Sequence, residues 1–238
     1  MPDYPIDSRR AAAAERYPSR IAPLRAAGRR RFRGLLFRLF GPAQVSRQTQ
    51  LAALPVPPKH ILFLGDSITE QGMWHEWFPD LPTVNRGVGG ETTEQVLART
   101  DAALNEPTAV FLLIGTNDIS GAVATSDILA NLRAIIAAIR HRAPDAPLFV
   151  ESIMPRTLKY REELTHLNRL YREAVADAGE NVSYVDLWPA LATPAGALRA
   201  EFTGDNVHLN GEGYRAWVDL LRPIIDHVTT PTPSIGQS

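Results

Sequence analysis

The chain has 238 residues, of which 45% are hydrophobic and 21% are charged, and its formal net charge at pH 7 is -1. This length and composition are typical of a soluble globular protein with one sizeable domain and room for an appendage. The lack of cysteine excludes disulfide bonds, thiolate metal sites and a cysteine nucleophile.

The N-terminal part of the chain is strongly basic. Residues 1–50 contain 11 arginines against three acidic residues, whereas the rest of the chain has 14 basic and 23 acidic residues. From Ile21 to Phe40, apolar residues recur at helical spacing and arginines fall mostly on the other side. We predict a basic amphipathic helix over 21–40, which follows a loose arm and ends near Gly41-Pro42.

Two interpretations of the helix predicted over 21–40 remain open. Its apolar side could pack on the main domain with the arginines in solvent, which is the commonest fate of such helices, or the helix could contact an anionic surface. We expect no nucleic-acid binding, because no base-reading motif accompanies the arginines. Residues 1–19 lack the apolar core of a secretory signal, so we expect a cytoplasmic protein, with peripheral membrane contact as the alternative.

The chain is predicted to divide into three parts. Residues 1–58 form an arm with the basic helix and a proline-rich linker that begins at Leu51. Residues 59–227 form the main domain. The last part, 228–238, is rich in threonine, proline and serine, and we expect it to be a disordered tail.

Within the main domain, apolar runs alternate with helical patterns. The predicted strands are 61–65, 83–85, 109–114, 148–150 and 182–185. The predicted helices are 92–104, opened by a Thr92–Gln95 capping box, a long one capped by Ser126 or Asp127 that runs to His141, 162–178 and 213–227. This alternation predicts an α/β fold with a doubly wound parallel sheet covered on both faces.

Polar residues follow the first three predicted strands. Ser67 comes after the first strand, the glycine-rich stretch 87–90 after the second and Asn117 after the third. Because parallel strands share one carboxyl edge, we expect these residues to lie on the same rim, where such sheets bind ligands. A serine there could simply cap the next helix. The same rim could also offer the nucleophile and oxyanion donors that acyl transfer requires.

A base for this serine is expected from the loop between the fifth strand and the last helix. Asp205 and His208 lie three residues apart there, a spacing that lets the carboxylate approach one ring nitrogen while the other points at Ser67. An isolated Asp-x-x-His is more often a solvated loop or the start of a helix. Its interpretation therefore depends on the other stretches.

Four stretches together resemble the blocks of the SGNH, or GDSL-type, hydrolase family. They are Gly-Asp-Ser-Ile-Thr at 65–69, Asn85 to Thr92, Gly-Thr-Asn-Asp at 115–118 and Asp205 to His208, and they occur in family order. The resemblance covers roughly residues 59–227. It implies a three-layer α/β/α sandwich with a five-stranded parallel, flavodoxin-like sheet.

The resemblance also implies roles for individual residues. Ser67 would be the nucleophile, His208 the general base and Asp205 the acid that orients it. The backbone N–H groups of Ser67 and Gly90 and the side-chain amide of Asn117 would form the oxyanion hole. We interpret the neighbouring Asp66 and Asp118 as structural carboxylates that accept from loop N–H groups.

The predicted activity is hydrolysis of carboxylic esters, with short acyl or acetyl groups favoured and with no metal or cofactor. The alternatives are transfer of the acyl group to another acceptor and a non-catalytic module that binds lipid or carbohydrate. Trp74 and Trp77 could contact the substrate or could belong to the core. The partner expected is a small ester, and the residues leave the oligomeric state open.

Overall fold

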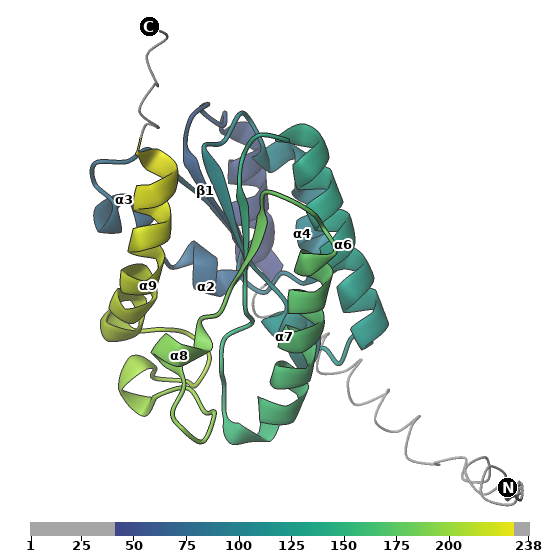
Figure 1. Ribbon diagram of the computed structural model, residues 1–238, viewed down its shortest axis with the longest axis vertical. Helices are drawn as coiled ribbons and strands as arrows, with labels where there is room; N and C mark the ends of the chain where they lie inside the picture. The colour runs from purple at the N-terminus through teal and green to yellow at the C-terminus, as the bar shows by residue number, and fades with distance from the viewer. Residues whose placement is uncertain (1–40, 231–238) are drawn as a thin grey trace, which may run out of the picture. The chain divides into compact units, whose positions relative to one another are not determined.

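The computed structural model describes residues 41–230 (Figure 1). Its centre is a five-stranded sheet made of β1 (Ile61–Gly65), β2 (Thr83–Gly87), β3 (Ala109–Leu113), β4 (Leu148–Glu151) and β5 (Val182–Val185). The strand order is β2-β1-β3-β4-β5, and all neighbouring strands are parallel. The predicted doubly wound sheet is therefore confirmed.

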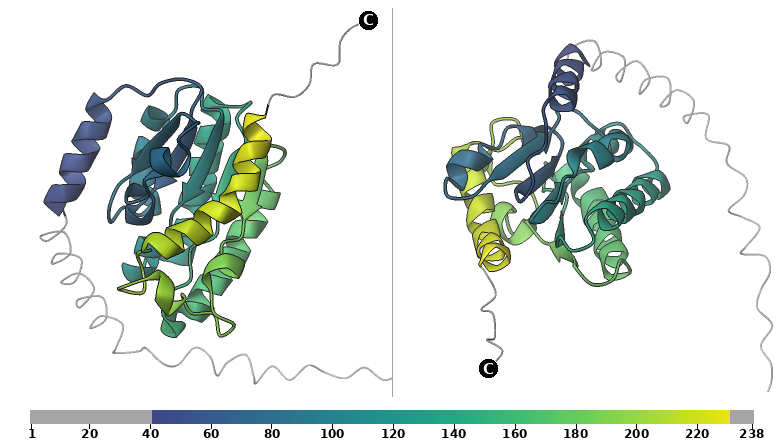
Figure 2. Two further views of the ribbon diagram at one scale, coloured as in Figure 1. Left: turned by 90° about the vertical axis from the view of Figure 1, so that its left-hand side faces the viewer. Right: turned by 90° about the horizontal axis from the view of Figure 1, so that it is seen from above.

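Helices cover both faces of the sheet (Figures 1 and 2). On one face lie α4 (Thr93–Arg99), α6 (Thr125–Arg142) and α7 (Arg161–Ala176), while α9 (Gly211–Thr229) lies on the other. The shorter helices are α2 (Ser67–Glu70), α3 (Trp74–Trp77), α5 (Thr116–Ser120) and α8 (Trp188–Leu191), with 3-10 turns at Asp101–Ala103, Leu158–Tyr160 and Ala200–Phe202.

The central strands are apolar throughout because both of their faces are buried. Leu62 and Leu64 of β1 point into the core beneath α4, α6 and α7, whereas Ile61 and Phe63 point into the core beneath α9. Successive side chains of a strand alternate between faces, so one run of apolar residues supplies both cores. This packing fixes the carboxyl ends of β1, β2 and β3 side by side.

Three predicted helix boundaries are wrong. The helix predicted over 92–104 ends at Arg99, and Asp101–Ala103 form a separate 3-10 turn. Residues 41–53 are helical, so Gly41-Pro42 does not end helical structure. A proline lacks an N–H and crowds the preceding turn, but it leaves the following residues free to be helical. The long helix α6 is preceded by Ala124 and not capped by Ser126 or Asp127, which lie in its first turn. An acidic side chain there favours the helix through its dipole instead.

Several expectations for the ends of the chain are not tested. The basic helix predicted over 21–40, its contact with an anionic surface and most of the tail lie outside the described residues. The boundary predicted between residues 58 and 59 stays a prediction. Within 41–230, no helix is long and apolar enough to cross a membrane.

Candidate active site

Three predicted residues from two distant parts of the chain form a hydrogen-bonded line. Ser67 begins α2 directly after β1, and its Oγ lies 2.9 Å from Nε2 of His208. The other ring nitrogen of His208, Nδ1, lies 2.6 Å from Oδ2 of Asp205. This is the arrangement in which a histidine can take a proton from a serine while a carboxylate fixes its tautomer.

The loop that carries Asp205 and His208 is held by its own short-range hydrogen bonds. Oδ1 of Asp205 accepts from the backbone N–H groups of Val207 and His208 at 2.9 and 2.8 Å. Thr203 Oγ donates to the carbonyl of His208 at 2.7 Å. Asn210 then caps α9 by accepting from two N–H groups of its first turn. These contacts fix the turn in which Asp205 contacts His208 and His208 contacts Ser67.

The environment of Asp205 keeps it ionised. Its partial burial would raise the pKa, but the hydrogen bonds from His208 and Val207 outweigh that effect and lower the pKa of Asp205 from 3.8 to about 2. The side chain is 53% exposed, so the hydrogen bonds and not a buried charge hold it in place. Asp205 can therefore accept the N–H of His208 throughout the neutral range.

The other two predicted oxyanion donors, Gly90 and Asn117, lie in the segments that follow β2 and β3. Asn117 lies in α5 directly after β3, and its Nδ2 donates one hydrogen to the carbonyl of Glu91 at 2.9 Å, which leaves the second hydrogen available. Gly90 has φ +77°, a conformation that favours glycine. Among residues 41–230, no acceptor contacts the backbone N–H groups of Ser67 and Gly90. Unused donors are what a developing oxyanion would need.

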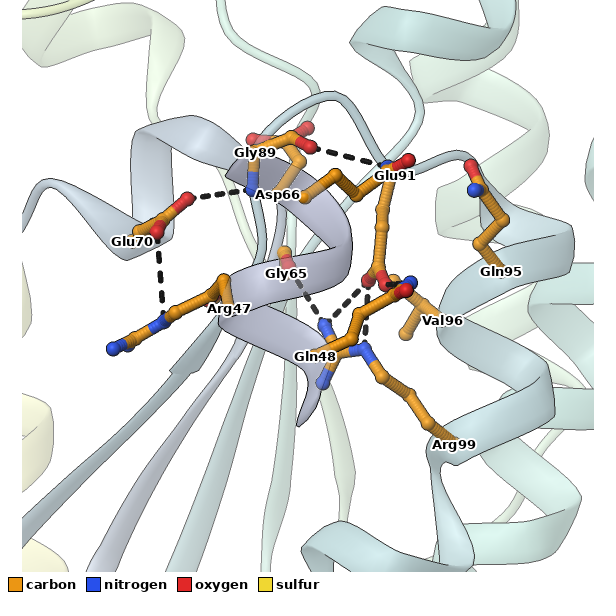
Figure 3. A network of polar contacts seen from close by, with 12 residues as sticks. Arg47, Gln48, Gly65, Asp66, Glu70, Gly89, Glu91, Gln95, Val96 and Arg99 are labelled. Carbon is orange, nitrogen blue, oxygen red and sulfur yellow. Dashed lines mark hydrogen bonds and ion pairs between the residues drawn. The ribbon is translucent and has the colours of Figure 1, made fainter. Parts of the chain in front are cut away.

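The loop that carries Gly90 is held by a network of polar contacts (Figure 3). Glu70 Oε2 accepts from the N–H of Gly89 at 2.6 Å, and its Oε1 lies 3.5 Å from Nε of Arg47. Glu91, which is fully buried, pairs with Arg99 at 2.6 Å. Arg99 in turn donates to the carbonyl of Gly65 at 3.0 Å.

Asn85 braces the same loop from its start. Its Nδ2 donates to the carbonyls of Thr69, Glu70 and Gly72, and its Oδ1 accepts from the N–H of Gly87. It thereby joins β2 to the segment that follows Ser67.

The two acidic residues next to predicted site positions have structural contacts. Oδ1 of Asp66 accepts from the N–H of Ile68 and caps α2. Asp118 accepts from the N–H and the Oγ of Thr93, and so joins α5 to the start of α4. Burial raises the pKa of Asp66 to about 7 and also raises the pKa of Asp118. Both carboxylates thus accept from N–H groups, as predicted, but these N–H groups belong to the first turns of α2 and α4 and not to loops.

The two tryptophans suggested as substrate contacts differ in position. Trp74 is 1% exposed and stacks on Phe63, with ring centroids 3.8 Å apart. Its burial in the core beneath α9 favours the core interpretation over a substrate contact. Trp77 is half-buried at the edge of the same core, and the guanidinium of Arg215 lies 6.0 Å from its ring centroid.

Sequence reasoning missed the residues that support the site from a distance. Arg47, Glu70, Glu91 and Arg99 were not singled out, although Glu91 lies inside the second family-like block. Arg156, which follows β4, was also given no role. It donates to Oγ of Ser120 at 2.8 Å and to the carbonyl of Thr116, the residue before Asn117. Single charged residues far apart in the chain carry no local pattern that could have identified them. No group of three or more histidine, aspartate or glutamate side chains in 41–230 is placed to hold a metal ion.

Comparison with known proteins assigns the chain to a family. Residues 63–216 match the model of the GDSL-like Lipase/Acylhydrolase family. The chain is 28% identical over 188 residues to platelet-activating factor acetylhydrolase IB subunit alpha2 of Rattus norvegicus, with 75% of this chain and 81% of that protein covered.

Solved structures of similar proteins agree with this match. A candidate platelet activating factor from Streptococcus pneumonia has a TM-score of 0.75 and 32% identity, with 81% of this chain and 97% of that chain covered. A GDSL-like lipase from Bacteroides thetaiotaomicron has a TM-score of 0.64 and 26% identity, with 77% and 97% covered. The chain belongs to the GDSL-like lipase/acylhydrolase family and is a carboxylic-ester hydrolase.

Proposed function

We propose that the protein is a metal-independent serine esterase that removes short acyl groups, acetyl in particular, through an acyl-enzyme on Ser67. The observation that carries this proposal is the line of contacts from Ser67 Oγ through His208 to Asp205, at 2.9 and 2.6 Å. The preference for acetyl groups is supported by the 28% identical relative, which is named as an acetylhydrolase.

In the proposed first step, Nε2 of His208 takes the proton of Ser67 Oγ while Oγ attacks the ester carbonyl. The carbonyl oxygen becomes negatively charged and accepts from the N–H groups of Ser67 and Gly90 and from the Asn117 amide. When the carbonyl forms again, His208 gives its proton to the leaving alkoxide, and an alcohol departs. The acyl group is then bound to Ser67 as an ester.

In the second step, water takes the place of the alcohol. His208 accepts a proton from water as the water oxygen attacks the acyl carbonyl, and the same donors stabilise the second tetrahedral intermediate. Collapse of this intermediate breaks the bond to Ser67 Oγ, which recovers its proton from His208. The products are a carboxylic acid and the free enzyme.

The test is the Ser67→Ala variant assayed on p-nitrophenyl esters from acetyl to palmitoyl. Loss of the nucleophile should lower kcat by about 10⁴-fold or more, because the triad acts as a unit. The variant should also fail to react with a fluorophosphonate, whereas wild type should react with and without EDTA. Undiminished turnover by Ser67→Ala would refute the mechanism, and a preference for palmitoyl esters would refute the short-acyl assignment alone.

A further inference from the structure

The helix at 41–53 presents one polar side to the loop 87–91. Gln44, Arg47, Gln48 and Leu51 are half-buried, at the spacing of a single helical face, whereas residues 45, 46, 49 and 50 are exposed. The carbonyl of Leu51 accepts from Arg86 of β2 at 2.6 Å, which anchors the end of this helix beside the sheet. Figure 2 shows the helix, in dark purple, outside the β2 edge.

Arg47 contacts the start of the loop directly and its middle through Glu70. Its Nε donates to the carbonyl of Gly87 at 3.2 Å, and a terminal nitrogen donates to the carbonyl of Asn85 at 3.4 Å. The same guanidinium faces Glu70, whose other oxygen accepts the N–H of Gly89 (Figure 3). One side chain therefore restrains both sides of a stretch that contains three glycines.

Two glutamines of the same face hold the rest of the loop. Gln44 Nε2 donates to the carbonyl of Gly89 at 3.1 Å, and Gln48 Nε2 donates to Oε1 of Glu91 at 2.7 Å. Gly90 lies between these two anchored residues. Glu91 also supplies the carbonyl that orients the amide of Asn117. The helix thus contacts both neighbours of Gly90, and one of them, Glu91, is the residue whose carbonyl accepts from the Asn117 amide.

These contacts are not a by-product of core packing. Within the described part of the chain, neither hydrophobic core includes a residue of the helix 41–53. The residues that match the family model begin at 63, so the helix also lies outside that match. What attaches it to the domain is the set of polar contacts with the loop and with Arg86.

We propose that Arg47 is a positioning residue that holds the Gly90 N–H in place for the oxyanion, with Gln44 in a supporting role. Glycines have the largest backbone freedom to lose, so a Gly-Val-Gly-Gly loop needs external restraints to keep one donor geometry. Arg47 also opposes the negative charge of Glu70, whose carboxylate accepts the N–H of Gly89, the residue next to Gly90. This inference rests on the proposed function.

The experiment compares full-length Arg47→Ala, Arg47→Lys and Gln44→Ala with wild type on p-nitrophenyl acetate. A mutation far from the reacting atoms that displaces a catalytic donor can lower the rate by about 10²-fold. Arg47→Ala should therefore lower kcat by about 10- to 100-fold, with KM nearly unchanged. Fluorophosphonate labelling of Ser67 should slow in parallel. Arg47→Lys should recover part of the rate because it restores the charge opposite Glu70. Gln44→Ala should show a smaller loss.

The matched control is Gln50→Ala on the exposed side of the same helix, where, within residues 41–230, the side chain hydrogen-bonds only to Ser46. It should keep wild-type kcat, KM and labelling rate. Circular dichroism on every variant reports folding, and if Arg47→Ala does not fold, Arg47→Lys and Gln44→Ala decide the question.

If folded Arg47→Ala has wild-type kcat, the positioning role is overturned. If Arg47→Ala does not fold, wild-type kcat in both Arg47→Lys and Gln44→Ala overturns it. A raised KM with kcat preserved would overturn it too, because Arg47 would then contact the substrate. Ser67→Ala separates the positioning role of Arg47 from the proposed function. If that variant is inactive while Arg47→Ala matches wild type, the positioning role fails and the proposed function stands.

Discussion

The two sides of the candidate site are built in opposite ways. On the acid–base side, Thr203, Asp205 and His208 are tied by hydrogen bonds between residues two to five positions apart. On the oxyanion side, the loop 87–91 is tied to Arg47 by a contact that spans 40 residues and to Gln44 by one that spans 45. The first side is a self-contained turn, and the second is assembled from remote elements.

The difference also appears in burial and charge. Asp205 and His208 have side chains 53% and 35% exposed, so water can compensate for part of any lost contact. Glu91 is fully buried against Arg99, so the loss of one partner would leave a buried charge unpaired. Substitutions outside the turn 203–208 should therefore disturb the acid–base side little, whereas the oxyanion side should respond to changes far from Ser67.

The largest expected effect is on the acid–base side, at Asp205. Asn at this position can donate to Nδ1 of His208 and so hold the ring in the wrong tautomer, while keeping the shape of the turn. Asp205→Asn should lower kcat by about 10³- to 10⁴-fold. Steady-state kinetics on p-nitrophenyl acetate measure this, with circular dichroism to confirm the fold. A loss smaller than tenfold would mean that another group orients His208.

The next effect is on the oxyanion side, at Asn117. Removal of one donor to the oxyanion typically costs about 10²- to 10³-fold in kcat, so Asn117→Ala should show that loss with KM near wild type. Asn117→Asp should be worse because a carboxylate repels the oxyanion. Fluorophosphonate labelling should persist at a lower rate. If KM rose while kcat was preserved, Asn117 would be a contact to the bound substrate instead.

A smaller effect is expected at Thr203, within the self-contained turn. Thr203→Val removes the hydroxyl that donates to the His208 carbonyl and accepts from the N–H of Asn206 at 2.9 Å. The hydrogen bonds made by Asp205 remain, so kcat should fall by less than about tenfold, equivalent to about one net hydrogen bond. Thr203→Ser, which keeps the hydroxyl, should restore the rate. A loss as large as that of Asp205→Asn would show that the turn is not self-contained.

Glu151 tests whether burial of a carboxylate is by itself enough to affect activity. It is as buried as Glu91, but within residues 41–230 its side chain accepts from Nε1 of Trp217 at 2.7 Å and does not pair with an arginine. Burial raises the pKa of Glu151 from 4.5 to about 8. Glu151→Gln keeps an acceptor for Trp217, so kcat at neutral pH should stay at the wild-type value.

The pH dependence of stability should change in this variant. Between pH 4.5 and about 8 the unfolded wild type loses the Glu151 proton that the folded protein keeps, so stability falls as pH rises by about 1.4 kcal/mol per pH unit from this group. Below pH 4.5 this group causes no loss of stability, and above about pH 8 the loss of stability that it causes stays constant. The free energy of unfolding, measured with urea from pH 4 to 9, should therefore depend less on pH for Glu151→Gln than for wild type. Parallel curves for the two proteins, with exposed Glu180→Gln as control, would contradict this.

The sheet and the short-range parts of the site could be predicted from the amino-acid sequence. Apolar runs such as 61–65 and 109–114 contain the strands because a strand buried on both faces needs apolar side chains throughout. The Thr92–Gln95 capping box and the Asp205–His208 turn are formed by residues three apart, so their spacing in the chain almost fixes their spacing in space. The order of the family-like blocks brought Ser67 and His208 into one prediction.

The side chains that support these residues could not be identified before the fold was known. Arg47 and Arg99 are ordinary basic residues in the sequence, and their partners Glu70 and Glu91 lie 23 and 8 positions away. From the sequence, Trp74 could contact the substrate or belong to the core, and its packing against α9 places it in the core. An ion pair forms, or an aromatic ring is buried, only where two elements pack against each other. The packing of both hydrophobic cores decides which elements do so, and no local sequence pattern records it.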